Sequence, residues 1–386
     1  MEEFTEEINE TSRKLASIQR ILALEPIPGA DRIETATILG WKVVVEKGKY
    51  RVGQLVVYAE IDSLFPARPE YEFLSKTGYR IKTIRLKQQV SQGIVFPLSV
   101  LKWNDNIKII GDEVLDDNYD YINDMWNEES PLLLLQDMNN DSNPAIFLAE
   151  GTDVTEWIGV TKYEPVVPAQ LRGVARGGFP SWLHKTDECR IQAIPDLLER
   201  HIGTTIRGHE KLDGSSCTMY IRNGDFGVCS RNLNLKHTEG NSFWEIAMKF
   251  QVEAMMKHCF PDYNFAIQGE LIGPGIQGNK YNLRETTIRL FNVFDIDKDE
   301  YLHDLESKYV AQQLGLEWCP WVMDYVITEN TTVEELLLLA QGPSALNPNQ
   351  EREGLVWRPL VESKDDKIGR FSFKTISNKF LLKNGE

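Results

Sequence analysis

The sequence predicts an α+β protein with two domains, a small β-barrel followed by a larger domain of strands and helices. Its 386 residues, 42% of them hydrophobic, exceed the ~250 residues beyond which a single hydrophobic core rarely grows. Residues 18–96 are short apolar runs separated by turn residues, whereas after residue 203 the strands are interrupted by segments of helical period. These patterns place the barrel first and the mixed domain second.

Residues 1–102 are expected to form an OB-type barrel. Residues 43–45 are a β-branched run and residues 84–87 alternate apolar with basic side chains, while residues 47–49 and 51–54 have turn chemistry. Short strands at this spacing are typical of a small β-barrel. The stretch 21–41 also resembles the start of tRNA-binding OB domains.

Residues 103–173 are expected to be an acidic insertion and a linker. Acidic side chains crowd residues 104–141, a leucine run follows at 131–135, and prolines stand at 165 and 168. The insertion accounts for much of the formal net charge of −16. This charge argues against a protein that coats nucleic acid nonspecifically, but it permits a local basic groove.

Residues 174–386 are expected to form the second domain. Residues 203–231 alternate as strand, turn and strand, residues 241–260 have a helical period, and further strands are predicted at 265–271 and 288–296. A helix capped by threonine should carry the leucine cluster at 336–339. Antiparallel sheets with flanking helices are therefore expected.

The sequence also predicts a soluble, cytoplasmic protein. The N-terminal segment is acidic and has no apolar core of signal-peptide length, and no window approaches ~18 uninterrupted apolar residues. The five cysteines are an odd number without a CxxC pair, so we expect reduced thiols in cores, with neither disulfides nor a zinc site. Nothing in the sequence implies a membrane or a protein partner.

The segment 210–216 is the most informative for chemistry. Lys211 stands where a strand ends, followed by Leu212, Asp213 and Gly214. A lysine at the floor of a cleft can act as a covalent nucleophile if burial, a metal ion or a cation such as Lys374 lowers its pKa. The alternative interpretation is an ordinary surface turn, in which Lys and Asp before Gly are common.

This segment resembles motif I of the covalent nucleotidyltransferases, which include ATP- and NAD-dependent polynucleotide ligases and mRNA capping enzymes. The other motifs follow in order: 230–232 is similar to motif Ia, 268–273 to motif III, 291–296 to motif IIIa, 353–358 to motif IV and 371–374 to motif V. The resemblance implies an ATP-grasp-like ligase domain in which Lys211 and Lys374 are catalytic. It also implies that the nucleotide is bound by Glu210, Arg231, Glu270, Glu353 and an aromatic residue, with Phe294 favoured over Phe291.

Asp213, Glu270 and Glu353 are the candidate ligands of Mg²⁺ or Mn²⁺. Carboxylates are the hard oxygen ligands that Mg²⁺ prefers, and they can act through its bound waters, so direct coordination is not predicted. Taken singly, each carboxylate can also be an ordinary solvated or salt-bridged surface group. For the two phenylalanines the alternative is a core position, which at least one of them should occupy.

Two segments, 179–192 and 371–383, are similar to the RNA ligases that join an N-terminal OB domain to a nucleotidyltransferase domain and seal nicks in duplexes. The resemblance implies that the enzyme adenylates itself with ATP, transfers AMP to a 5′-phosphate, and joins a 3′-hydroxyl RNA end with release of AMP. Two features depart from the family: Ser372 stands where many ligases have a second lysine, and the acidic stretch 104–141 has no counterpart.

RNA contact in the barrel is assigned to Arg80, Lys82, Arg85 and Lys87. Residues two apart on a strand project from one face, so each of the pairs 80/82 and 85/87 could follow a nucleic-acid backbone. The alternative is a solvated edge strand with protective charges.

Three other functions compete with an RNA ligase. A DNA ligase or a capping guanylyltransferase would use the same lysine chemistry, but these enzymes usually place the OB domain after the catalytic domain. A non-catalytic RNA-binding protein with a decayed transferase domain is the third, and the presence of Lys211, Glu270, Glu353 and Lys374 argues against it.

Overall fold

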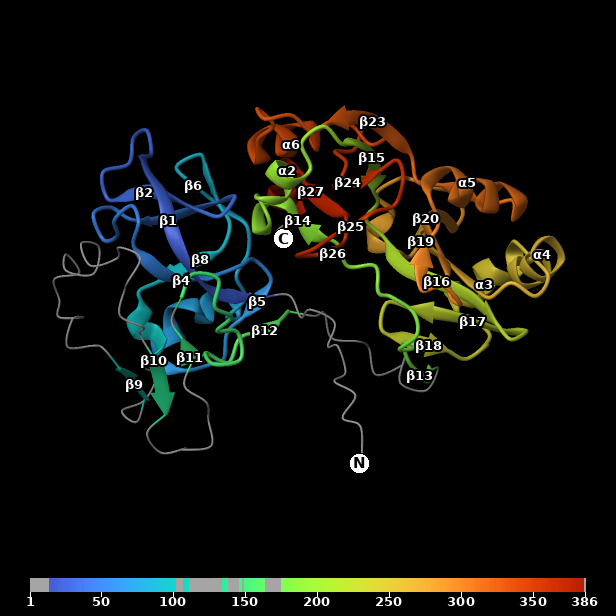
Figure 1. Ribbon diagram of the computed structural model, residues 1–386, viewed down its shortest axis with the longest axis horizontal. Coiled ribbons are helices and arrows are strands. Elements are labelled where there is room, and N and C mark those ends of the chain that lie inside the picture. Colours follow the sequence, from blue (N-terminus) through green and yellow to red (C-terminus); the bar gives the residue numbers. More distant parts are fainter. Residues whose placement is uncertain are drawn as a thin grey trace. The chain divides into compact units, whose positions relative to one another are not determined.

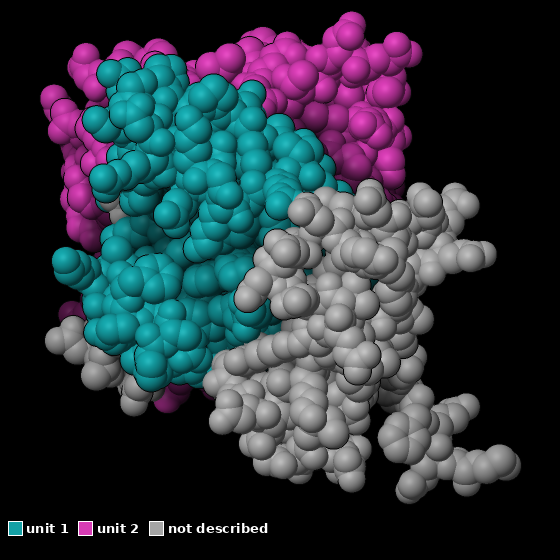
Figure 2. Space-filling view, turned by 90° about the vertical axis from the view of Figure 1, so that its left-hand side faces the viewer, with its two compact units in different colours: residues 1–165, 384–386 teal, residues 166–383 magenta. Residues whose placement is uncertain are grey.

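The computed structural model describes residues 14–101, 149–163 and 175–384, together with the backbone of 107–110, 134–137 and 146–147. The chain divides into two compact units, residues 1–165 with 384–386 and residues 166–383 (Figures 1 and 2). Among the residues described, no helix combines the length and the hydropathy needed to cross a membrane.

The first unit contains a five-stranded antiparallel sheet in the order β3-β2-β1-β4-β8. Strand β1 (Ala16–Pro26) pairs with β4 (Leu55–Ala59) through its first half and with β2 (Ile33–Ile38) through its second half, with an irregularity between Ile21 and Ala23. The two ends of the sheet approach each other, because the carbonyl oxygen of Lys42 on the end strand β3 (Trp41–Glu46) accepts a hydrogen bond from Gln92 N. Gln92 lies just before β8 (Ile94–Phe96), the strand at the other end. The predicted OB-type barrel is confirmed as a nearly closed sheet.

Smaller elements complete the first unit. A two-stranded hairpin, β6 (Ile84–Leu86) with β7 (Gln89–Ser91), precedes β8, and its side chains on β6 are exposed. The remaining described elements are β5 (Ser63–Leu64), the 3-10 helices η1 (Pro69–Thr77) and η2 (Leu98–Leu101), and β12 (Thr161–Lys162), which pairs with β5.

The segment expected as insertion and linker differs in part from that expectation. Residues 149–163 belong to the barrel, because Ile18 N donates to Thr152 O, Val154 N donates to Ala16 O, and Val154, Ile158 and Val160 are buried. The backbone of β9 (Ile107–Ile110), β10 (Leu134–Asp137) and β11 (Ile146–Phe147) forms a small antiparallel sheet. Most of the acidic stretch 104–141 lies outside the described residues.

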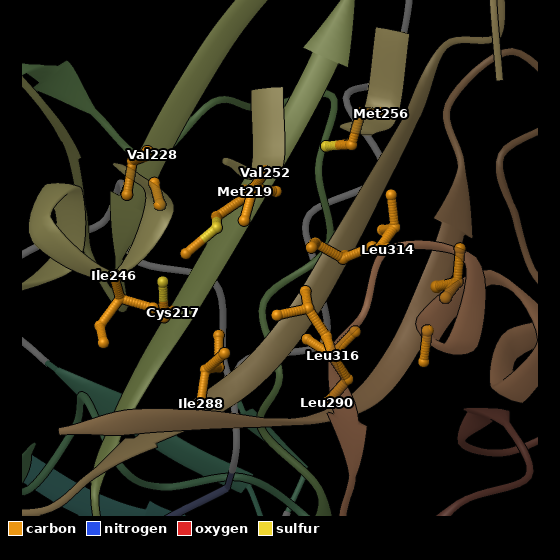
Figure 3. Close-up of a cluster of buried hydrophobic side chains, with 14 of the residues drawn as sticks. Cys217, Met219, Val228, Ile246, Val252, Met256, Ile288, Leu290, Leu314 and Leu316 are labelled. Carbon is orange, nitrogen blue, oxygen red and sulfur yellow. The ribbon is translucent and has the colours of Figure 1, made fainter. Parts of the chain in front are cut away.

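The larger sheet of the second unit has the order β13-β18-β17-β16-β19-β20-β21, with β22 parallel to β20. Three helices, α3 (Ser242–Lys249), α4 (Val252–Cys259) and α5 (Asp304–Gln313), contribute to the core on one face of this sheet. There Ile246, Met256 and Leu314 meet Met219 and Leu290 from the strands (Figure 3). The strands are β13 (Ala175–Gly178), β16 (Ser215–Arg222), β17 (Asp225–Ser230), β18 (Leu233–Leu235), β19 (Phe265–Ile272), β20 (Thr287–Asp295), β21 (Glu300–Tyr301) and β22 (Glu317–Trp318). Its other face carries a second, smaller apolar cluster that includes Tyr220, Ala266 and Phe294, and it also carries Glu270.

The second sheet of this unit has the order β14-β27-β24-β15-β23. Trp357, Phe371 and Phe373 form its core together with α2 and α6. The elements of this half are β14 (Cys189–Arg190), η5 (Ile191–Ala193), α2 (Leu197–Arg200), β15 (Thr205–Lys211), β23 (Trp321–Val326), α6 (Val333–Leu339), β24 (Gly354–Pro359), β25 (Lys364–Asp365), β26 (Gly369–Arg370), β27 (Phe373–Ile376) and α7 (Asn378–Asn384).

Local sequence explains where the helices begin and end. The predicted helix 241–260 is two helices, α3 (Ser242–Lys249) and α4 (Val252–Cys259), because Gln251 has a positive φ of 49°. The side chain of Asn241 caps α3 by accepting hydrogen bonds from Phe243 N and Trp244 N. Thr332 caps α6 in the same way through Glu335 N, as predicted, and α5 (Asp304–Gln313) completes the set.

Candidate active site

Lys211 ends β15 and forms an ion pair with Glu353, which immediately precedes β24. The distance from Lys211 Nζ to Glu353 Oε1 is 2.6 Å, and the side chains are 27% and 12% exposed. The two residues meet because β15 and β24 are antiparallel, with Lys211 opposite Gly354. Position 354 requires glycine, since a Cβ would lie 2.1 Å from the carbonyl oxygen of Thr375. Residues 142 positions apart in the sequence are thus brought together.

Glu270 approaches the same lysine from the other sheet. It lies on β19, opposite Ser216 of β16, which begins just after the turn that follows Lys211. Gly214 in that turn lets the strands approach, because a Cβ there would lie 2.2 Å from the carbonyl oxygen of Leu271. Burial, partly offset by Lys211, raises the pKa of Glu270 to about 8. The lysine and the carboxylates of motifs I, III and IV therefore form one cluster.

The charge state of Lys211 differs from the sequence expectation. Burial lowers the pKa of Lys211, but the carboxylates of Glu353, Glu270 and Asp213 outweigh burial and raise the pKa above its ordinary value. Without a nucleotide and a metal ion, the site therefore holds Lys211 as an ammonium ion. The predicted lowering of its pKa requires additional positive charge near these carboxylates.

The carboxylate oxygens suit a divalent cation, but they do not form a ready set of direct ligands. Among the described residues, no group of three His, Cys, Asp or Glu side chains lies close enough together to hold a metal ion. Glu353 Oε2 is nevertheless buried without a hydrogen-bond partner in the described part of the chain, although its hard oxygen needs one. This orphaned oxygen fits a cation or its bound water.

Lys374, the other predicted catalytic lysine, lies on β27 opposite Val356 of β24. Val356 is in turn opposite His209, two residues before Lys211 on β15. Cross-strand partners and residues two apart share one face of a sheet, so both lysines project from the same face. Ser372 is buried and accepts a hydrogen bond from Arg358 Nε.

Arg231 is exposed, and its Nη2 lies 2.7 Å from both carboxylate oxygens of Asp187. Asp187 belongs to a short segment that contacts several other site residues. Thr186 Oγ1 lies 3.1 Å from Ser216 Oγ, and Glu188 accepts a hydrogen bond from Arg358 Nη2 at 2.8 Å. The segment 186–188 thus orients both arginines.

The two candidate stacking residues have different surroundings. Phe294 is 1% exposed and is packed against the rings of His184 and Tyr301. It faces the side of the sheet that carries Glu270, because it lies opposite Ala266 on β19. Phe291 is half-buried near Leu212, and its carbonyl oxygen accepts from Arg358 Nη1. A base can stack on Phe294 only after the side chains that cover it move.

Glu210 is directed away from Lys211. Neighbouring residues of a strand project from opposite faces, and the carboxylate of Glu210 is buried, with Oε2 accepting from Ala345 N at 2.7 Å. Burial raises its pKa. The side chain of Glu210 therefore packs on the face of the sheet opposite to Lys211. Only the backbone of Glu210 lies beside the catalytic face.

The four basic residues of the barrel do not form one row. Arg80 is paired with Asp62 at 2.7 Å and stacks on Tyr163, with its guanidinium 4.0 Å from the ring centroid, so it has a structural role. Lys82 is half-buried and precedes β6. Arg85 on β6 and Lys87 in the hairpin turn are exposed, and the positive φ angles of Lys87 and Gln88 form that tight turn.

Two features of the site were absent from the sequence prediction. Lys280 forms an ion pair with Asp213, and Tyr281 Oη accepts a hydrogen bond from Asp213 N at 2.6 Å. Arg358 joins Glu188, Ser372 and the Phe291 carbonyl. Lys280 and Tyr281 lie 67 and 68 positions from Asp213, and Arg358 lies 67 positions from Phe291 and 170 from Glu188, so no local spacing indicates these contacts.

Two sequence families match the chain. The family described as RNA ligase matches residues 204–376, and a family described as an OB-fold domain matches residues 15–98. No curated protein matches this chain. The two matches fall on the two units and follow the order predicted from the sequence.

Several solved structures are similar to the whole chain. Naegleria gruberi RNA ligase with PPi is 34% identical over 97% of this chain and 99% of that chain, with a TM-score of 0.76. A single-residue alanine mutant of that ligase with ATP and Mn is 34% identical over 97% and 100% of the two chains, with a TM-score of 0.77. Another such mutant, with AMP and Mn, is 33% identical over 96% and 98%, with a TM-score of 0.75.

Proposed function

Because this chain belongs to the RNA ligase family, we propose that it uses ATP to join a 3′-hydroxyl RNA end to a 5′-phosphate through an AMP adduct of Lys211. The observation that carries the proposal is the cluster in which Lys211 Nζ lies 2.6 Å from Glu353, with Glu270 close by on the facing sheet. A lysine so placed has both the nucleophilic nitrogen and the acidic surroundings that phosphoryl chemistry with a cation requires.

In the first step, Lys211 Nζ attacks the α-phosphorus of ATP after losing a proton. The N–P bond forms as the bond from the α-phosphorus to the pyrophosphate oxygen breaks, so pyrophosphate leaves with that electron pair. Lys374, on the same face as Lys211 by strand register, supplies positive charge to the crowded anionic transition state. The nitrogen must be neutral to attack, so the carboxylates that hold the ammonium must be compensated first.

Asp213, Glu270 and Glu353 would hold the divalent cation, directly or through its waters. The cation supplies charge compensation for both the phosphates and the carboxylates. The N. gruberi ligase complexes with ATP or AMP and Mn support the use of a divalent cation. Removal of divalent cations is therefore expected to stop adenylation while leaving the fold intact.

Two further transfers complete the reaction. An oxygen of the RNA 5′-phosphate attacks the phosphorus of lysyl-AMP, the N–P bond breaks, and Lys211 Nζ takes up a proton and leaves as a free amine. The 3′-hydroxyl then loses its proton and attacks the activated 5′-phosphate, the new phosphodiester forms, and AMP leaves with the electron pair of the broken P–O bond. Contact with the ribose or the RNA end is assigned to Arg231, which is exposed and whose guanidinium is held by Asp187.

Base recognition is assigned to Phe294 in motif IIIa, with Phe291 as the alternative. Phe294 lies on the face of β20 that is directed toward the side of Glu270, where the rings of His184 and Tyr301 cover it. Opening of the His184 contact would expose its ring.

RNA contact by the barrel is assigned to the β6–β7 hairpin. Arg85 and Lys87 are exposed there, whereas Arg80 is held by Asp62. Residues 73–104 contain no Asp or Glu, in a chain whose net charge is −16, so this part of the barrel is favourable for a phosphate backbone. A nicked duplex is the proposed substrate. The five free cysteines fit a reducing compartment such as the cytoplasm.

Sealing assays test the proposal. Wild-type protein with ATP and Mg²⁺ or Mn²⁺ should join a labelled nick whose 3′-hydroxyl strand is RNA, and GTP should not replace ATP. A duplex with a DNA 3′-hydroxyl strand is the matched control. Equal sealing of both strands would redirect the proposal to DNA, and nucleotide transfer only from GTP would indicate a capping enzyme.

A further inference from the structure

The loop between β19 and β20 has an unusual backbone. Positive φ angles occur at Gln277 (43°), Gly278 (70°), Asn279 (48°) and Asn282 (52°). Glycine and asparagine enter the left-handed region readily, whereas for the side chain of Gln277 it is disfavoured. Such conformations persist where surrounding contacts fix them, and they often occur at functional sites. The contacts that fix this loop are therefore informative.

The loop contacts the turn that carries the proposed nucleophile. Lys280 Nζ forms an ion pair with Asp213 Oδ2. Tyr281 Oη accepts a hydrogen bond from Asp213 N at 2.6 Å, and Gln277 Nε2 donates to Gly214 O at 3.4 Å. The loop therefore contacts both the side chain and the backbone of the turn, two residues beyond Lys211.

Lys280 is also held by residues on the other side from Asp213, on α7 and in the loop before β24. Its Nζ lies 4.5 Å from the centroid of the Phe380 ring on α7, and its carbonyl oxygen accepts from Asn347 Nδ2 at 2.9 Å. The side chains of Lys280 and Asp213 are only 20% and 15% exposed. A pair with so little exposure is geometrically defined, unlike a solvated surface pair.

The charge of Lys280 matters because the site is rich in carboxylates. Glu353 is paired with Lys211, and Glu270 and Asp213 act on the same lysine electrostatically. Lys280 partners Asp213, which would otherwise be a partly buried carboxylate able to rotate toward Lys211. The pair thus fixes where Asp213 lies and, through the chain, where the turn after Lys211 begins.

We propose that Lys280 is a positioning residue of the active site, which holds Asp213 and thereby the turn that presents Lys211 to the α-phosphate. This inference depends on the proposed function, because it assigns Lys280 a part in the same adenylation. Lys280 Nζ contacts the turn through the side chain of Asp213. Its loss should therefore slow the chemical step more than it weakens binding of ATP.

The test measures single-turnover transfer of label from α-labelled ATP to the protein over a range of ATP concentrations. Lys280→Met removes the charge and keeps most of the volume, and Lys280→Arg keeps the charge. Lys257→Met is the matched control, since Lys257 is paired with Glu253 on α4. Circular dichroism and thermal midpoints establish that each variant is folded.

Lys280→Met should lower the maximal labelling rate by about 10-fold or more, as expected when a reacting group is misplaced. The ATP concentration at half-maximal rate should change by less than about 3-fold, since ATP binding energy is largely retained. Lys280→Arg should recover most of the rate, and Lys257→Met should match wild type.

The double variant Asp213→Asn/Lys280→Met removes both charges and tests whether the two residues act as one unit. If the pair acts as one unit, the maximal labelling rate of the double variant should lie within about 2-fold of the rate of the slower single variant. A rate loss equal to the product of the two single losses would overturn the proposal.

Two other results would also overturn it: a wild-type rate for Lys280→Met, or a loss confined to the ATP dependence, which would make Lys280 a nucleotide contact. Failure of the proposed function looks different, because then wild-type protein itself acquires no label from ATP, and Lys280 has no adenylation to support.

Discussion

Lys211 Nζ lies 2.6 Å from Glu353 Oε1, and this pair joins the end of one strand to the start of its antiparallel neighbour. The pair keeps the proposed nucleophile in place but also keeps it protonated, because Glu353, Glu270 and Asp213 outweigh burial and raise its pKa. Adenylation therefore requires additional positive charge near these carboxylates. The site is organised for a cation–nucleotide complex.

Glu270→Gln tests the electrostatics of the cluster through the pH dependence of stability. Burial raises the pKa of Glu270 from 4.5 to about 8 in the folded protein. Between these values the folded state keeps a proton that the unfolded state releases, so Glu270 lowers stability as pH rises, by up to about 1.4 kcal/mol per pH unit. Thermal unfolding of both proteins at pH 5.5 and pH 8 measures this effect.

The gain in stability of Glu270→Gln over wild type should be larger at pH 8 than at pH 5.5. The substitution keeps the size of the side chain, so packing losses should be the same at both pH values. An equal difference between the two proteins at both pH values would show that Glu270 titrates normally.

Substitution of the two phenylalanines by leucine tests the assignment of the stacking residue. Phe294→Leu should raise the ATP concentration at half-maximal adenylation by about 3- to 10-fold, the size expected for loss of one aromatic contact. Phe291→Leu is the matched control and should change it less. Phe294→Ala should instead lose about 3 to 5 kcal/mol of stability, because Phe294 is 1% exposed. A larger effect at Phe291 would transfer the stacking role to that ring.

The basic residues of the barrel can be separated by substituting one at a time. Arg85→Ala should weaken nick sealing, more at low salt than at high salt, and leave labelling by ATP unchanged, because Arg85 is exposed on the hairpin and a phosphate contact contributes most at low salt. Arg80→Ala should lower the thermal midpoint, because Arg80 is paired with Asp62 and stacked on Tyr163. Loss of labelling in Arg85→Ala would contradict this division of roles.

The departure at motif V is tested by Ser372→Lys, which restores the lysine common in this family. Ser372 is 3% exposed and already accepts a hydrogen bond from Arg358. A lysine at this position would be buried beside Arg358 and would displace the hydroxyl, so stability should fall by about 1 to 3 kcal/mol. Adenylation should not become faster. A faster and equally stable variant would show that the position faces the nucleotide.

Much of the fold followed from local patterns. The strands β19 and β20 and the capped helix α6 were predicted within a few residues, because apolar alternation and caps are local signals. The division of the helix 241–260 into α3 and α4 was not predicted, since it depends on the backbone of Gln251. The contribution of residues 149–163 to the barrel depends on pairing with strands more than 100 residues earlier.

The site was predictable where sequence motifs carry it. Lys211, Glu270 and Glu353 are brought together as the ordered motifs indicated. Sequence spacing could not show that Arg80 is paired with Asp62, or that the side chain of Glu210 is directed to the face of the sheet opposite to Lys211. It also could not show Lys280, whose partner Asp213 lies 67 positions away. Such long-range pairs are fixed by tertiary packing.

The most direct test of the central claim is transfer of label from α-labelled ATP to purified protein with Mg²⁺ or Mn²⁺, followed by denaturing electrophoresis. Lys211→Met, which removes the amine but keeps most of the side-chain volume, and GTP in place of ATP are the controls. We expect a covalent label from ATP with wild type and none with Lys211→Met or with GTP. A label that persists in Lys211→Met, or no label in wild type under any condition, would contradict the assignment of Lys211 as the nucleophile.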